Sequence, residues 1–150
     1  MPGTWADALE NRLPLLAAAL WWGSGICLGF IAVPLVFRHA GDVALAARIT
    51  PQLFAAQSWL ALGCGLLLLV MRPRRMQRQD RIRIGLVALG MLLALLVSYA
   101  AAPRIAARID LPLWHTLGVL MYAGQWLCAT ALLWQLAGQD KAASSCVDAG

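Results

Sequence analysis

Long apolar stretches alternate with short charged segments along the chain. Four stretches contain no Asp, Glu, Lys or Arg: residues 13–37, 52–71, 84–102 and 113–137. Because a helix rises about 1.5 Å per residue, each stretch is long enough to cross about 30 Å of hydrocarbon. Their Leu and Ala runs lack the two-residue alternation of a membrane strand, and in lipid a helix satisfies its own backbone polar groups. The pattern predicts an all-α fold, a polytopic bundle of four transmembrane helices.

The charged segments between and beyond these stretches are too short to bury a core of their own. This excludes a separate catalytic, nucleotide-binding or DNA-binding domain, so residues 1–150 are expected to form a single membrane domain. We expect residues 72–83 to connect the second and third helices, and residues 138–150 to form a flexible tail. Thr50 before Pro51 offers a capping hydroxyl and a proline at the first helical position, which predicts that the second helix begins there.

The composition indicates a membrane protein, and the distribution of Lys and Arg residues predicts its orientation in the membrane. The chain is 61% hydrophobic and 13% charged, against roughly 25% charged in soluble domains. Half of its twelve Lys and Arg residues lie between the second and third stretches: Arg72, Arg74, Arg75, Arg78, Arg81 and Arg83. Short cytoplasmic loops collect positive charge. We therefore expect a protein of the inner membrane with this loop and both termini in the cytoplasm.

The same arginines and a formal net charge of +5 also raise the question of nucleic-acid binding. No aromatic residue accompanies them to stack on bases, so no nucleic-acid partner is expected. Arginine is a good phosphate ligand, and the basic loop is expected to contact anionic lipid headgroups of the bilayer.

A weak internal repeat relates the two halves of the chain. Residues 46–50 (AARIT) align with residues 106–110 (AARID). If the repeat is real, the bundle consists of two parallel helical hairpins related by an axis along the membrane normal. The alternative is that two outer connections need the same capping and anchoring residues.

Small residues in the first stretch indicate close helix packing. Gly25 and Gly29 are four residues apart, which lets a neighbouring helix approach closely where side-chain burial gains nothing over lipid. The neighbour is either another helix of the same bundle or a second copy of the chain in a homo-oligomer.

The fourth stretch carries the main candidate site. His115, Tyr122 and Gln125 have helical spacing and are expected to share one face with Gly118 and Cys128. Polar groups in hydrocarbon usually face protein or a watery cavity, because their burial without partners is costly. Two interpretations stay open. Either Tyr122 and Gln125 bond neighbouring helices while His115 lies at the outer interface, or the face contacts a substrate or ion.

Five sulfur-containing residues lie near the middles of the stretches: Cys27, Cys64, Cys128, Met91 and Met121. Thiols and thioethers at similar depth could bind Cu(I) or another soft cation. Alternatively they only fill space, as Cys and Met do in apolar interiors. The two histidines do not suit a transmembrane haem, and the stretches hold no carboxylate, phosphate-binding loop or serine motif. We expect no cofactor and no enzymatic activity.

The chain also resembles the bacterial relatives of transmembrane protein 205 over roughly residues 13–137. The positions that carry the likeness are Trp22, Gly23, Pro34, Phe37, Arg48, Phe54 and His115. The resemblance implies a small four-helix membrane protein without an established activity. The eukaryotic relative is linked to resistance toward platinum drugs, which would suit handling of soft metals or small molecules.

Three functions stay open at this point. We expect a non-enzymatic structural or accessory membrane component that binds lipid, another membrane protein or a second copy of itself. The first alternative is a small permease or resistance factor for soft metals or small molecules. The second alternative is a redox or metal-binding membrane subunit.

Overall fold

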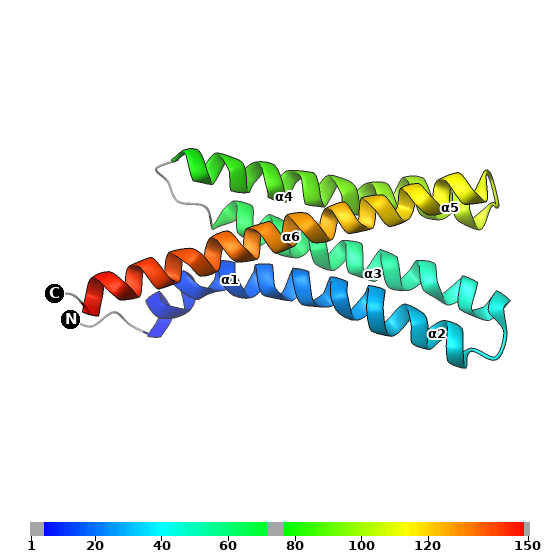
Figure 1. Cartoon of the computed structure of the whole chain (residues 1–150), viewed down its shortest axis with the longest axis horizontal. Coiled ribbons are helices and arrows are strands. Elements are labelled where there is room, and N and C mark those ends of the chain that lie inside the picture. Colours follow the sequence, from blue (N-terminus) through cyan, green and yellow to red (C-terminus); the bar gives the residue numbers. More distant parts are fainter. Residues whose placement is uncertain (1–4, 72–76, 149–150) are drawn as a thin grey trace.

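The computed structural model describes residues 5–71 and 77–148, nearly all of them helical (Figure 1). In chain order the elements are α1 (Trp5–Ile26), the π-helical segment η1 (Cys27–Ala32), α2 (Val33–His39), α3 (Val43–Val70), α4 (Arg78–Leu96), the π-helical segment η2 (Val97–Ala101), α5 (Ala102–Ala106) and α6 (Leu111–Asp148). They group into four spans long and apolar enough to cross a membrane: Arg12–His39, Ala44–Val70, Arg78–Ala106 and Leu111–Gly138. The predicted all-α bundle of four transmembrane helices is confirmed.

The spans run up and down, and both ends of the chain lie at the same end of the bundle (Figure 1). Helix α3 ends and α4 begins at that end as well, and the α2–α3 and α5–α6 connections lie at the other. Helix α6 contacts α1 and α4, and α3 also contacts α1 and α4. These contacts close a ring of four spans, so each span presents one side to the interior and one to the surroundings.

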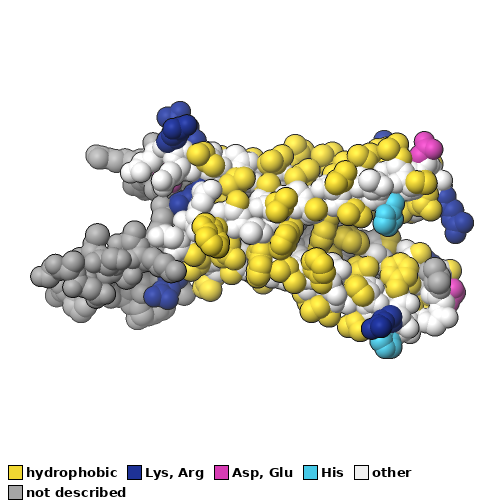
Figure 2. Space-filling model, viewed as in Figure 1, with side chains coloured by type: hydrophobic (Ala, Val, Ile, Leu, Met, Phe, Trp, Pro, Cys, Tyr) yellow, Lys and Arg dark blue, Asp and Glu magenta, His cyan; other side chains and the backbone are white. Residues whose placement is uncertain are grey.

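On the face that Figure 2 shows, apolar side chains form a band, and charged side chains lie toward its two ends. Large apolar side chains project from all four spans, with exposed fractions of 75% for Phe30, 66% for Trp59, 52% for Leu92 and 83% for Trp134. A contiguous apolar surface of this kind is unfavourable in water and favourable in hydrocarbon. The chain is therefore a multi-pass membrane protein.

Two prolines account for the two π-helical segments. Pro34 and Pro103 stand at the start of α2 and α5, directly after η1 and η2. Proline has no N–H, and its ring clashes with the carbonyl four residues earlier. The residue before each proline donates its N–H five residues back, from Val33 to the carbonyl of Leu28 in the first span. The wider turn accommodates the proline, so the first and third spans share this local distortion.

The prediction that the second helix begins at Thr50 was wrong. Helix α3 begins at Val43, and Thr50 and Pro51 lie inside it. Its N-cap is Asp42, whose side chain accepts a hydrogen bond from the Ala44 N–H at 2.9 Å. A carboxylate at the N-cap satisfies a free N–H and favours the positive end of the helix dipole, so the helix extends past the charge-free stretch.

Three other expectations about boundaries change. Residues 46–50 lie within α3, whereas residues 106–110 end α5 and form the turn before α6, so the aligned segments have different local structures. In that turn Arg108 and Asp110 have positive φ angles of 55° and 41°. Helix α6 continues to Asp148, so the expected tail from residue 138 is helical up to there. The basic loop is shorter than expected because α4 begins at Arg78.

Candidate functional site

The polar face predicted on the fourth span lies partly inside the bundle. Gln125 and Cys128 are 4% and 6% exposed, and Tyr122 is half-buried. Gly118 lies against α5 and the preceding π-helical segment. His115 is exposed near the start of α6. The central residues therefore lie where neighbouring helices meet, and His115 lies at one end of the bundle.

Tyr122 joins α6 to the first span. Its hydroxyl donates a hydrogen bond to the carbonyl of Gly25 at 2.7 Å. A Cβ atom added to Gly29 would lie 3.3 Å from Cε1 of the Tyr122 ring. The ring also meets Phe54 of α3 edge to face, with 5.2 Å between centroids. The two glycines therefore make room for a side chain of the same chain, which corresponds to the predicted packing within the bundle.

Three tryptophans lie around this contact. The indole N–H of Trp22 donates to the Thr130 hydroxyl at 3.0 Å, and its ring stacks with Trp126 at 6.4 Å between centroids. Trp21 is 1% exposed and packs against Gly90 of α4. Within residues 5–71 and 77–148, the buried indole N–H groups of Trp21 and Trp126 have no hydrogen-bond acceptor. The cluster thus contains two donors that the described side chains and backbone do not satisfy.

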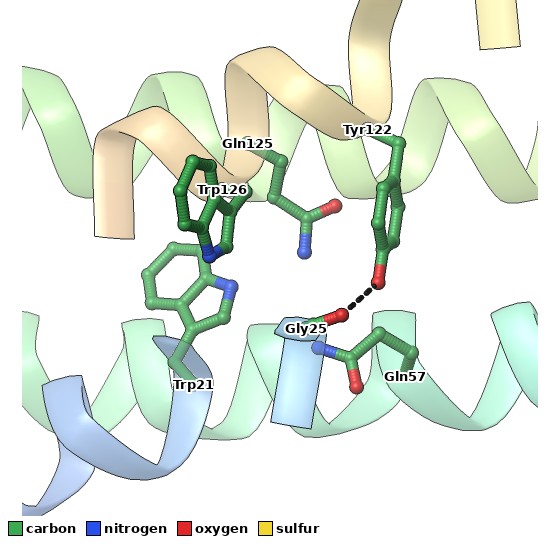
Figure 3. A pocket seen from close by; sticks show the side chains of 6 residues that line it. All are labelled: Trp21, Gly25, Gln57, Tyr122, Gln125 and Trp126. Atoms are coloured by element: carbon green, nitrogen blue, oxygen red, sulfur yellow. Dashed lines mark hydrogen bonds between the residues drawn. The ribbon is translucent and has the colours of Figure 1, made fainter. Parts of the chain in front are cut away.

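A small cavity lies beside these two indoles (Figure 3). Its lining consists of Trp21, Gly25, Gln57, Tyr122, Gln125 and Trp126. The space open to the centre of a water-sized sphere is about 10 Å³, close to the smallest cavity that holds one water. Figure 3 shows both indole nitrogens and the Gln125 amide nitrogen turned toward a common space, with the Gly25 carbonyl nearby.

Polar residues of the other spans belong to the same interior network, and the sequence analysis missed them. The Gln57 amide donates to the Ser24 hydroxyl at 3.1 Å, joining α3 to α1. Ser58 lies 3.1 Å from the carbonyl of Ala94 and accepts a hydrogen bond from Ser98 at 2.7 Å, joining α3 to the third span. The adjacent Gln57 and Ser58 in an otherwise apolar stretch were the available signal. Their partners could not be identified without the packing.

The three cysteines of the predicted soft-metal set differ in exposure. Cys27 is exposed, whereas Cys64 and Cys128 are buried. Among the described residues, no group of three or more His, Cys, Asp or Glu side chains is placed to hold a metal ion. Met91 and Met121 are half-buried on different spans. Similar depth along the membrane was the basis of the prediction, but the rotation of the first span turns Cys27 outward while Cys64 and Cys128 are buried.

The residues that carry the family resemblance are spread over the bundle. Trp22 and Phe54 contact the aromatic cluster. A Cβ on Gly23 would meet nothing within 4 Å, so no close approach requires this glycine. The remaining positions, Pro34, Phe37, Arg48 and His115, are exposed in the half of the bundle away from the termini. The resemblance therefore does not mark one site.

The basic loop is divided between two environments. Arg78 and Arg81 are exposed in the first turn of α4. Arg83 points into the bundle, where its guanidinium donates to the side chain and carbonyl of Gln135 at 3.3 and 3.2 Å and lies 3.9 Å from Asp80. The other three arginines of the loop, Arg72, Arg74 and Arg75, lie outside the described residues. Arg83 thus connects α4 to α6.

Comparison with known proteins gives a family but no characterised relative. No curated protein and no solved structure matched the chain. A family model described as a domain of unknown function, DUF4149, matches residues 16–110. The match covers the second and third spans and most of the first, and it ends before α6, which supplies half of the cavity lining. The chain therefore belongs to the DUF4149 family of membrane proteins of unknown function.

Proposed function

We propose that the protein is a non-enzymatic structural or accessory component of the inner membrane. The observation that carries the proposal is that polar side chains form hydrogen bonds across the spans. Three bonds join two side chains, Gln57 with Ser24, Ser98 with Ser58, and Trp22 with Thr130, and a fourth joins the Tyr122 hydroxyl to the Gly25 carbonyl. Interhelical hydrogen bonds of this kind hold membrane helices together. These four hydrogen bonds therefore stabilise the bundle, and a partner would contact its outer surface.

Site-specific photo-crosslinking in native membranes tests this proposal. A photoreactive amino acid replaces one outward side chain on each span in turn: Phe30, Trp59, Leu92 or Trp134, all more than half exposed. A partner protein or a second copy should give a discrete crosslinked band from one or two of the four positions. Unirradiated membranes are the control. Lipid adducts alone at all four positions would contradict the proposal.

The proposed orientation places both termini and the α3–α4 connection in the cytoplasm. The support is the positive-inside rule applied to the six arginines of residues 72–83. In a cysteine-free background, Ala107→Cys lies in the α5–α6 turn and Gln79→Cys lies in the first turn of α4, and both positions are exposed. A membrane-impermeant maleimide added to spheroplasts should label Ala107→Cys at once and Gln79→Cys only after permeabilisation. The reverse order would overturn the orientation.

A small permease or resistance factor is the second candidate. The uncharged polar side chains of Gln57, Tyr122 and Gln125 at mid-span favour it, because polar groups inside membrane spans often mark a substrate pathway. The likeness to the bacterial relatives of transmembrane protein 205 supports the same candidate. A deletion strain should then change its sensitivity to platinum compounds, copper salts or small organic toxins, and a plasmid copy should restore it. Unchanged growth and uptake across these compounds would remove this candidate and leave the first in place.

A further inference from the structure

Two buried donors face one small cavity in the centre of the bundle. The indole N–H groups of Trp21 and Trp126 are buried and have no acceptor in the described part of the chain. An indole nitrogen only donates, so its hydrogen bond must end on an oxygen or another acceptor. Burying such a group without a partner is costly, and structures rarely leave it so. From this we infer that the cavity binds one water molecule, which accepts hydrogen bonds from Trp21 and Trp126.

The lining selects a neutral ligand. All six lining residues are uncharged at neutral pH: Trp21, Gly25, Gln57, Tyr122, Gln125 and Trp126. An anion could accept from both indoles, but without a cationic side chain beside it the transfer from water into this apolar interior would be very unfavourable. A cation is excluded by the two N–H groups. The site therefore suits a small neutral molecule that accepts hydrogen bonds.

The size of the cavity and the hydrogen-bond acceptors in its lining identify this neutral molecule as water. The cavity offers about 10 Å³ to the centre of a water-sized sphere, which is about the space of one water and too little for a larger solute. A water that accepts from two indoles still has two protons to donate. The Gly25 carbonyl and the Tyr122 hydroxyl oxygen line the same space and can accept them (Figure 3). Buried waters typically make about three such bonds.

The water would connect spans that these tryptophans do not bond directly. Trp21 belongs to α1 and Trp126 to α6, and neither indole N–H reaches a protein acceptor in the described residues. Gln57 and Gln125 lie near the middles of their spans, so the site is near the membrane midplane. The inference stands apart from the proposed function, because a bound water can occur in a structural component or in a permease.

Nuclear magnetic resonance of the full chain in perdeuterated detergent, with ¹⁵N-labelled tryptophan, tests the inference. Trp21→Phe and Trp126→Phe each remove one indole signal and so identify the two resonances. Both N–H protons should show a direct nuclear Overhauser effect to a proton at the water frequency while exchanging slowly with bulk solvent. Trp59 is the matched control, because it is 66% exposed to the lipid side at a similar depth in α3 and should show no such effect. No effect at Trp21 and Trp126, or an equal effect at Trp59, would overturn the inference.

A crystal structure of the unmodified chain grown with bromide in place of chloride provides a second measurement that needs no variant. We expect a density peak within about 3.2 Å of both indole nitrogens, without anomalous signal at the bromine edge. A peak with bromine anomalous signal would show that the cavity binds a halide and would overturn the inference of a water. The absence of any peak in well-ordered density would overturn the inference that the cavity is occupied.

Discussion

The contact between Trp21 and Gly90 gives the sharpest prediction about stability. Gly90 is buried in α4, and a Cβ atom added there would lie 2.8 Å from Cη2 and 2.9 Å from Cζ2 of the Trp21 ring. Carbon atoms in contact are normally about 3.5–4.0 Å apart, so the ring would have to move by about 0.7 Å. Trp21 is 1% exposed and shares a buried cluster with Ala61, Ala129 and Leu132, so apart from the small cavity beside it there is little free space into which the ring can move.

Gly90→Ala should therefore destabilise the bundle. Overpacking of a close-packed core typically costs about 1–3 kcal/mol. Alanine in place of a helical glycine also gains up to about 1 kcal/mol of helix propensity, which must be subtracted. Gly63→Ala is the matched control, because a Cβ at this exposed position of α3 meets nothing within 4 Å. This variant should show only the gain in helix propensity. The free energy of unfolding of Gly90→Ala should lie about 1–3 kcal/mol below that of Gly63→Ala.

The measurement is a titration of the detergent-solubilised protein with sodium dodecyl sulfate, followed by near-ultraviolet circular dichroism. Repeating Gly90→Ala in a Trp21→Phe background tests the cause, because phenylalanine lacks the atoms Cη2 and Cζ2. Most of the penalty should disappear there, which gives a coupling energy of similar size. Equal stability of Gly90→Ala and Gly63→Ala would refute the reasoning. A penalty that persists in the Trp21→Phe background would show that another contact is responsible.

Three further predictions concern the interior network. Tyr122→Phe keeps the ring but removes the 2.7 Å hydrogen bond to the Gly25 carbonyl of α1. The same titration should show that the free energy of unfolding falls by about 0.6–2 kcal/mol. Unchanged stability would show that this hydrogen bond does not stabilise the bundle. Ser58→Ala should cost a similar amount, since Ser98 loses its acceptor, and a Ser58→Ala/Ser98→Ala double variant should cost less than the sum of the single changes. Among single-cysteine variants in detergent, Cys27 should react with an apolar maleimide faster than Cys64, because Cys27 is exposed and Cys64 is buried. Equal reaction rates would contradict the outward position of Cys27 and the inward position of Cys64.

Much of the architecture follows from the sequence because span length is a local property. The charge-free stretch 84–102 lies within the third span, and 113–137 within the fourth. Lipid cannot satisfy backbone polar groups, so each such stretch must be helical whatever its neighbours are. The same local reasoning predicted one face of α6, where Tyr122, Gln125 and Cys128 turn inward. The same reasoning placed the start of α3 wrongly, because Thr50 and Pro51 were read as the helix start although the N-cap is the earlier Asp42.

Only the tertiary structure decided which polar groups meet. Helices that are apolar nearly all round carry little information about their rotation, because lipid and a neighbouring helix are equally apolar surroundings. The pairing of Gln57 with Ser24, the outward position of Cys27 and the contact of Trp21 with Gly90 depend on that rotation. The charge-free stretches specify how many times the chain crosses the membrane, and the close packing of small residues against aromatic rings sets the interior that results.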